Sequence, residues 1–332
     1  MNAVRILGLG PVLACGQGVE ALTLALAGGG AEASAADITA GLSVFMPPAR
    51  TRRLDPLGRM ALLSSYLAVR DAGLASESAR SERWGIVVGT AFGPQASTFS
   101  YLDGLIDSGD HLVSSLAFTN SVHNLPAAQV SLALGISGPV TTVTAFGDTA
   151  GAAFQTARGW IRAGRADRVL LILGEEASPV LTSAVGWMGA GAGPVRPLEE
   201  GCSYAPQPGC TALLLGGGAG GYAGLGEVAE GLTTDEAAAR AAGVDCLFCA
   251  ASGRADEAAD YRALAARAGR VRAHAHLYGS LAAGPAVETA IAALAVAGRT
   301  AEPAFPGGPK PRTAAVACVS GTDRVTLMEI EE

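Results

Sequence analysis

The sequence predicts an α/β fold in which short buried strands alternate with helices. Three observations support this class: apolar runs too short for helices, helix-like segments between them, and 49% hydrophobic against 16% charged residues in 332. Runs this apolar are typical of central strands that helices cover on both faces. The predicted strands are 83–90, 139–145, 168–176, 210–218, 244–251 and 313–321, preceded by a first strand and glycine turn at the N-terminus.

Two segments between the strands carry the pattern of packed helices. Residues 149–163 repeat apolar side chains at helical spacing, and Gly164 follows as a stop signal. Residues 281–297 form a small-residue segment that we expect to be an almost wholly buried helix, with Pro285 in its first turn or at its true start. The spaced residues of the first helix are Ala150, Phe154, Ala157 and Ile161. A segment rich in Gly and Pro, 195–230, is expected to join two halves of the chain.

The net charge of −7, without a basic run, argues against nucleic acid and anionic membranes as partners. The densest basic cluster is Arg50, Arg52, Arg53 and Arg59, which is either a solvated loop, the simpler interpretation, or a contact for an acidic carrier. No window reaches the roughly 18 apolar residues of a membrane span. The N-terminus has a first strand in place of a signal peptide, so we expect a soluble, cytoplasmic protein.

The six cysteines are scattered along the chain, which predicts reduced thiols in a cytosolic protein. They are Cys15, Cys202, Cys210, Cys246, Cys249 and Cys318. The "CLFC" pair, Cys246 and Cys249, has no second pair at zinc spacing and lies in a strand pattern that points its side chains to opposite faces. We therefore expect no metal site, no redox site and no cofactor.

Five stretches, taken in order, resemble the β-ketoacyl synthases, the condensing enzymes of fatty acid and polyketide synthesis. They are "WGIVVGTAFGP", "FTNSVHNLPAAQVSLALGISGPVTTV", "RVLLILGEEA", "VRPLEEGCSYAPQPGCTALLL" and "VSGTDRVTLMEI". The resemblance runs over nearly the whole chain and implies a thiolase-like fold. Two similar βαβ-type halves, 1–217 and 218–332, would form one integrated unit with a layered α-β-α-β-α core.

The same resemblance locates the residues that family chemistry needs. Its members transfer an acyl chain to a cysteine at a helix start, where the helix dipole lowers the thiol pKa. Two histidines then support decarboxylation of malonyl on a carrier protein. Here the nucleophile position is Phe146, the histidine positions are Ala250 and Ser280, and a neighbouring lysine position is Ala275. No complete catalytic set remains.

The resemblance therefore favours a chain length factor, a non-catalytic subunit of an aryl-polyene-like pathway. Its implied partners are an active ketosynthase, in a heterodimer, and an acyl carrier protein. We expect Phe146 to fill the pocket that the cysteine has vacated, where its ring would add apolar burial.

Two other functions remain open. The first is an acyltransferase or decarboxylase with an altered site in which His276 keeps a proton-transfer role, since either His274 or His276 would face the old active site. The second is a homodimer that binds an acyl chain or lipid.

Simpler structural roles are expected for the remaining polar residues near these motifs. His123 is expected to satisfy a loop hydrogen bond, and Asp148 to cap the following helix. Glu175 and Glu176 are expected to form a solvated or capping turn.

Overall fold

A computed structural model describes the chain except for residues 1–2, 30–36, 188–194, 200–202, 301–308 and 322. Its strands form one mixed sheet, which runs in the order β4-β3-β5-β6-β1-β7-β11-β10-β8-β9, with β2 beside β1. In that order the bounds are Val140–Val143, Trp84–Gly89, Arg168–Glu175, Gly209–Gly217, Val4–Leu13, Ala223–Leu232, Arg324–Glu331, Thr313–Gly321, Cys246–Cys249 and Val271–Arg272, and β2 is Gly16–Gln17.

The two halves of the sheet meet where β1 pairs with β7, through Val4–Ile6 and Ala223–Leu225. Strands at each end of the path are parallel, as β4-β3-β5 and β10-β8-β9, whereas those in the middle are antiparallel. The predicted division at 217/218 falls in the turn between β6 and β7, and it stays a prediction.

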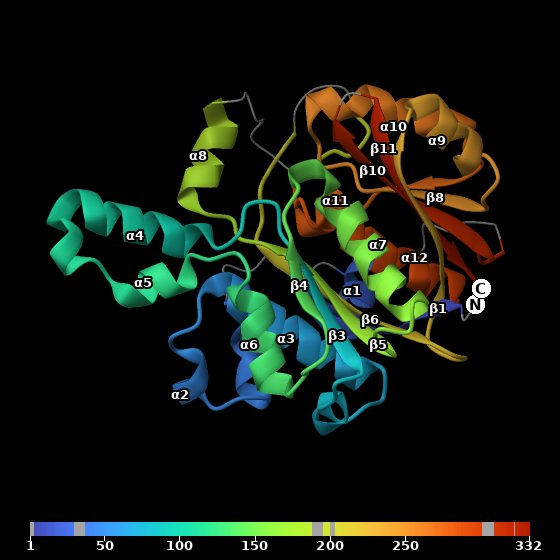
Figure 1. Ribbon diagram of the computed structural model, residues 1–332. Coiled ribbons are helices and arrows are strands. Elements are labelled where there is room, and N and C mark those ends of the chain that lie inside the picture. The colour runs from blue at the N-terminus through green and yellow to red at the C-terminus, as the bar shows by residue number, and fades with distance from the viewer. Residues whose placement is uncertain (1–2, 30–36, 188–194, 200–202, 301–308, 322) are drawn as a thin grey trace.

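Helices pack on the sheet in three layers (Figure 1). One outer layer holds α3 (Pro56–Asp71) and α6 (Leu125–Leu134), the central layer holds α7 (Thr149–Arg162) and α12 (Gly284–Val296), and the other outer layer holds α9 (Thr234–Ala241) and α10 (Ala255–Arg267). Three apolar clusters fill the spaces between these layers. Successive β5 residues alternate between two of them: Leu171 joins the central cluster and Leu170 the α3 cluster. The predicted α-β-α-β-α layering is thus confirmed.

The predicted strands and both predicted helices are present, with small shifts at their ends. Every residue of α12 is buried, and Pro285 lies in its first turn. Gly164 follows α7 with φ +67, a conformation that suits glycine. The treatment of 195–230 as a joining segment is wrong in one respect, because β7 begins within it. Glycines and exposed glutamates interrupt the apolar pattern of this strand.

Several elements connect or extend the layers. They are α1 (Gly18–Leu26), η1 (Ala40–Val44), α2 (Pro48–Thr51), η2 (Ser76–Ala79), η4 (Phe146–Asp148), α8 (Pro179–Trp187) and α11 (Ala275–Tyr278). A helical arm, made of α4 (Gln95–Ser108), η3 (Asp110–Leu112) and α5 (Ser115–Asn120), projects away from the body on the side of β4 (Figure 1). Among the described residues, no helix has both the length and the apolar character needed to cross a membrane.

Candidate functional site

The predicted nucleophile position lies on a tight elbow between β4 and α7. Phe146 has φ +47, an unusual backbone angle for a residue with a side chain. The Ala145 N–H donates to the Thr149 hydroxyl over 2.9 Å, which fastens the elbow to the first turn of α7. On the other side Gly147 packs so closely on β10 that a Cβ there would lie 2.8 Å from the Ser320 carbonyl oxygen. The elbow is therefore rigidly held.

Phe146 itself is 69% exposed, so the prediction that its ring fills a vacated pocket is wrong for this chain. The ring makes an edge contact with Phe92, at 6.2 Å between centroids. The reason for the exposure is that β4 is the end strand of the sheet, and its elbow opens at the margin of the fold. Asp148 occupies the N-cap position of α7 as expected, but its side chain makes no capping hydrogen bond.

A chain of contacts brings the three predicted positions to one end of β10. The Cys318 thiol lies 3.9 Å from the Gly147 carbonyl oxygen, and the Ala250 N–H donates to the neighbouring Ala317 carbonyl over 2.9 Å. Ser280 joins them because its hydroxyl donates to the Ser252 carbonyl over 2.5 Å.

That hydroxyl also accepts from the Ala205 N–H over 2.8 Å, and Ser280 is buried. Because both partners are backbone groups, the serine holds loops together and has little capacity left for a substrate.

The two candidate histidines lie in contrasting surroundings. His276 is exposed on α11, with its ring 6.3 Å from that of His274. His274 is buried and its Nδ1 lies 2.8 Å from Glu288 Oε2. Glu288 also accepts the His274 N–H over 2.7 Å and the Tyr278 hydroxyl over 3.0 Å. The sequence interpretation missed this network, although a lone glutamate in an apolar helix demands a buried partner.

The described cysteines are free thiols buried in the fold. Burial raises the pKa of Cys318 to about 12, as it does that of Cys210. Such a thiol is protonated at neutral pH and is a poor nucleophile. Cys246 packs in the central cluster and Cys249 in the α10 cluster, so the CLFC side chains face opposite ways, as predicted. Cys202 lies outside the described residues.

Glu175 and Glu176 are buried at the end of β5, so a solvated turn is wrong and a capping turn is correct. Glu175 accepts from the Thr90 hydroxyl at 3.0 Å and from the Ala91 and Phe92 N–H groups, the latter at 3.2 Å. Glu176 accepts from Leu57 and Ala96. Burial raises the pKa of each glutamate to about 7.

Residues 21–177 match the sequence profile of the β-ketoacyl synthase N-terminal domain. This match covers less than half of the 332 residues. Nodulation protein E of Rhizobium meliloti (strain 1021) is 30% identical over 168 residues, which cover 50% of this chain and 40% of that protein. The chloroplastic 3-oxoacyl-[acyl-carrier-protein] synthase I of Hordeum vulgare is 29% identical over 132 residues, covering 38% and 28%. The matches thus span less than half of these relatives.

Solved ketosynthase structures share the fold over the whole chain. The ishigamide ketosynthase/chain length factor has a TM-score of 0.82 at 18% identity, covering 99% of both chains. A β-ketoacyl synthase from Burkholderia phymatum STM815 has a TM-score of 0.76 at 18% identity, covering 100% of both chains. A type II ketosynthase in complex with its acyl-carrier protein, AntDE:AntF, has a TM-score of 0.79 at 14% identity, covering 100% of this chain and 99% of that one. The chain therefore has the mixed α/β ketosynthase fold.

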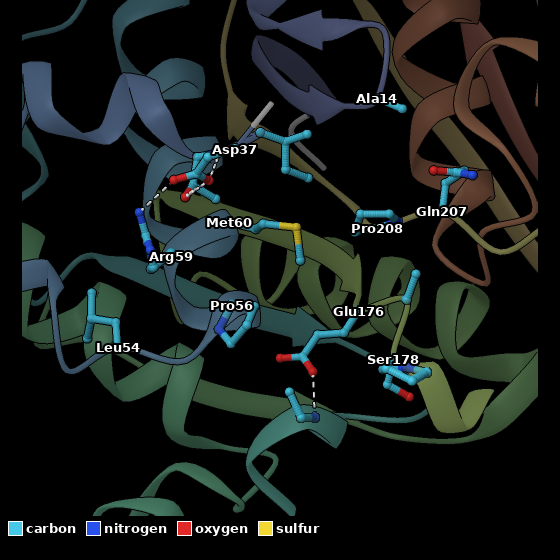
Figure 2. A pocket seen from close by; sticks show the side chains of 15 residues that line it. Ala14, Asp37, Leu54, Pro56, Arg59, Met60, Glu176, Ser178, Gln207 and Pro208 are labelled. Atoms are coloured by element: carbon cyan, nitrogen blue, oxygen red, sulfur yellow. Dashed lines mark hydrogen bonds and ion pairs between the residues drawn. The ribbon is translucent and has the colours of Figure 1, made fainter. Parts of the chain in front are cut away.

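The structure also contains a cavity of about 630 Å³, shown in Figure 2. It lies between the start of α3, the start of α8 and the loop 37–39, with Gln207 and Pro208 on a further wall. Glu176 and Ser178 line it, and Arg59 forms a 3.0 Å ion pair with Asp37 at another wall (Figure 2). None of the predicted catalytic positions lines this cavity.

The four arginines of the predicted basic cluster lie in two different surroundings in the structure. Arg50, Arg52 and Arg53 are exposed in and just after α2, whereas Arg59 belongs to α3 and is engaged by Asp37. His123 is exposed in the loop between α5 and α6, with its ring against Gly93. No hydrogen bond from the His123 ring is found among the described residues.

Proposed function

We propose that this chain is a non-catalytic ketosynthase-like subunit, a chain length factor, that pairs with an active β-ketoacyl-ACP synthase. The pathway would be fatty acid or polyketide biosynthesis of an aryl-polyene-like kind. The observation that carries the proposal is Phe146 on the elbow, at the position where the family resemblance expects a cysteine. A phenyl ring can neither attack a thioester nor carry a proton.

The surroundings of Phe146 support the same proposal. Ala250 has no titratable group, and the Ser280 hydroxyl is engaged by two backbone partners. The buried Cys318 thiol is held in its neutral form by its high pKa. A decarboxylase or acyltransferase would need His276, whose ring is exposed on α11.

Pairing with another subunit is supported by the apolar surface on one side of the molecule. Six large apolar side chains of the arm are exposed, and Val140 on the end strand β4 and Phe146 on the elbow are exposed as well. A patch of this kind is typical of a protein interface. An unpaired strand edge likewise favours an added chain. The six residues are Leu102, Leu105, Ile106, Leu112, Leu116 and Phe118.

An acyl carrier protein is proposed as the second partner. The chain carries a net charge of −7, so an acidic carrier needs a local basic surface. Arg50, Arg52 and Arg53 supply one, because they are exposed and form no salt bridge with the described residues.

Co-expression with an active β-ketoacyl-ACP synthase from the same genome tests the pairing. We expect a 1:1 complex on size-exclusion chromatography, and we expect Ile106→Asp on the arm to weaken it at least tenfold. The matched control is Leu24→Asp, a similarly exposed leucine on α1. A stable chain with no affinity for the ketosynthase would contradict the proposal. A homodimer that retains lipid in native mass spectrometry would replace it with the acyl-binding function.

A further inference from the structure

The cavity of Figure 2 has the size and surface of a small-molecule site. Its volume of about 630 Å³ lies in the range of ligand pockets, which are mostly apolar with a few polar groups. Met60, Pro56 and Pro208 provide apolar walls (Figure 2). Among the described residues, none from the elbow lines the cavity, and the arm contributes only Ala96, in the first turn of α4.

The polar groups of the cavity leave one acidic group without a counter-charge. Arg59 is neutralised by Asp37 at 3.0 Å. Glu176 is only 4% exposed and accepts two backbone N–H groups, from Leu57 at 3.1 Å and Ala96 at 2.9 Å. A carboxylate has about four lone-pair positions, so two remain.

The groups around Glu176 are acidic or neutral. Asp55, the N-cap of α3, repels a negative charge there, and Glu175 precedes it on β5. Ser178 donates its hydroxyl hydrogen to Gln95, whose amide nitrogen is buried without an acceptor. No lysine or arginine within the described ranges forms an ion pair with Glu176. Buried carboxylates are normally paired with a positive charge. A bound cation would supply the counter-charge that Glu176 lacks.

We propose that this cavity binds a small amphipathic amine. Its ammonium group contacts Glu176 and the Ser178 oxygen, and its apolar body packs on Met60, Pro56 and Pro208. An ammonium donates up to three hydrogen bonds, which suits the acceptors present. A carboxylate ligand is disfavoured, because it would lie near Glu176 and Asp55.

Binding of an amine is coupled to the loss of a proton from Glu176. Burial and the nearby Asp55 raise the pKa of Glu176, to about 7. A bound ammonium favours the ionised carboxylate and lowers that pKa. Affinity therefore rises as the pH rises through 7, and below pH 7 binding releases a proton.

The test is isothermal titration calorimetry of the full chain with octylammonium chloride, 1-octanol and sodium octanoate. At pH 8.5 we expect saturable binding of octylammonium, at least tenfold tighter than octanol, with octanoate weakest. At pH 6 the advantage of the amine over octanol should shrink severalfold. Equal affinity for octanol or octanoate, or no saturable binding of octylammonium, would overturn the proposal.

Substitutions of cavity residues test whether octylammonium binds in this cavity. Ala96 lines the cavity and is exposed within it, so Ala96→Leu should narrow the cavity without disturbing the core and weaken octylammonium at least tenfold. The matched control is Ala163→Leu, at an exposed position just after α7. Glu176→Gln should make the amine and octanol bind equally. If Ala96→Leu keeps its unfolding midpoint and binds octylammonium as the original chain does, the assigned site is wrong, whatever the outcome of the pairing experiment.

Discussion

Phe146 combines a left-handed backbone with a largely exposed aromatic ring, and neither feature stabilises an isolated chain. A residue with a side chain in this conformation costs about 1–2 kcal/mol relative to right-handed backbone. The elbow is nevertheless fixed by Thr149 and by the close approach of Gly147 to β10. Strain held at a rigid turn points to a functional origin of the turn. A partner subunit that covers the ring would explain why the apolar side chain is retained.

The exposure of Phe146 can be tested by comparing the loss of stability when its ring is removed with the loss when the ring of a buried phenylalanine is removed. Phe146→Ala keeps the backbone strain and removes only a surface ring, so the free energy of unfolding of the chain alone should change by less than about 1 kcal/mol. Phe154→Ala, which empties a fully buried site on α7, should cost about 3–5 kcal/mol. Urea denaturation compares the two, and equal losses would show that the elbow is buried.

Restoring the nucleophile should not restore the reaction. In Phe146→Cys the new thiol has Ala250 and Ser280 at the positions where the resemblance expects histidines, so no imidazole supports an enolate. We expect no condensation when the variant alone is given acyl- and malonyl-carrier substrates, as measured by mass spectrometry of the product. Substantial turnover would mean that the histidine positions have been assigned wrongly.

Glu175 and Glu176 should make stability depend on pH. Their pKa values are raised to about 7 from an ordinary 4.5, so between these values the folded chain keeps protons that the unfolded chain releases. Their contribution to the free energy of unfolding is therefore complete below pH 4.5 and is lost as the pH rises through 7. The two groups together account for on the order of a few kcal/mol.

The double variant Glu175→Gln, Glu176→Gln isolates this contribution. Urea denaturation at pH 5 and pH 8 should show a smaller loss of stability with rising pH in the double variant than in the original chain. An unchanged difference between the two pH values would show that the carboxyl groups titrate normally.

At the scale of elements, the sequence could predict whatever depends on local apolar patterns. Runs such as "RVLLILGEE" specify buried strands, and Pro285 marks the start of α12 because proline suits a first helical turn. β7 was missed because its glutamates break the apolar run. The exposure of Phe146 could not be predicted either, since it depends on β4 being the last strand of the sheet. Strand order is a long-range property that one segment does not encode.

Close packing between β1 and α3 gives a test at this scale. A Cβ at Gly10 would lie 2.0 Å from the Ser64 carbonyl oxygen, so Gly10→Ala must push α3 away from the sheet and should destabilise the chain by about 3 kcal/mol. Gly159 on α7 faces open space, and Gly159→Ala should stabilise it by about 1 kcal/mol. Thermal unfolding of both variants provides the comparison. Similar midpoints would contradict the described contact.

At the scale of the whole molecule, the ketosynthase fold is combined with a proposed loss of the catalytic residues. The layered core matches the fold of solved ketosynthase structures, yet the apolar arm, β4 and Phe146 remain uncovered on one side. A subunit that completes another enzyme accounts for both features. The basic surface of α2 would then serve carrier docking rather than catalysis. The test of the amine cavity uses the chain alone and reads out ligand binding, so it stands separately from the pairing test.

The most direct measurement is covalent labelling of the co-purified complex with a radiolabelled acyl thioester. We predict a 1:1 complex in which the label is confined to the cysteine of the ketosynthase subunit and this chain stays unlabelled. Label on this chain that survives denaturation would show that it carries a nucleophile, and would contradict the proposal of a non-catalytic subunit.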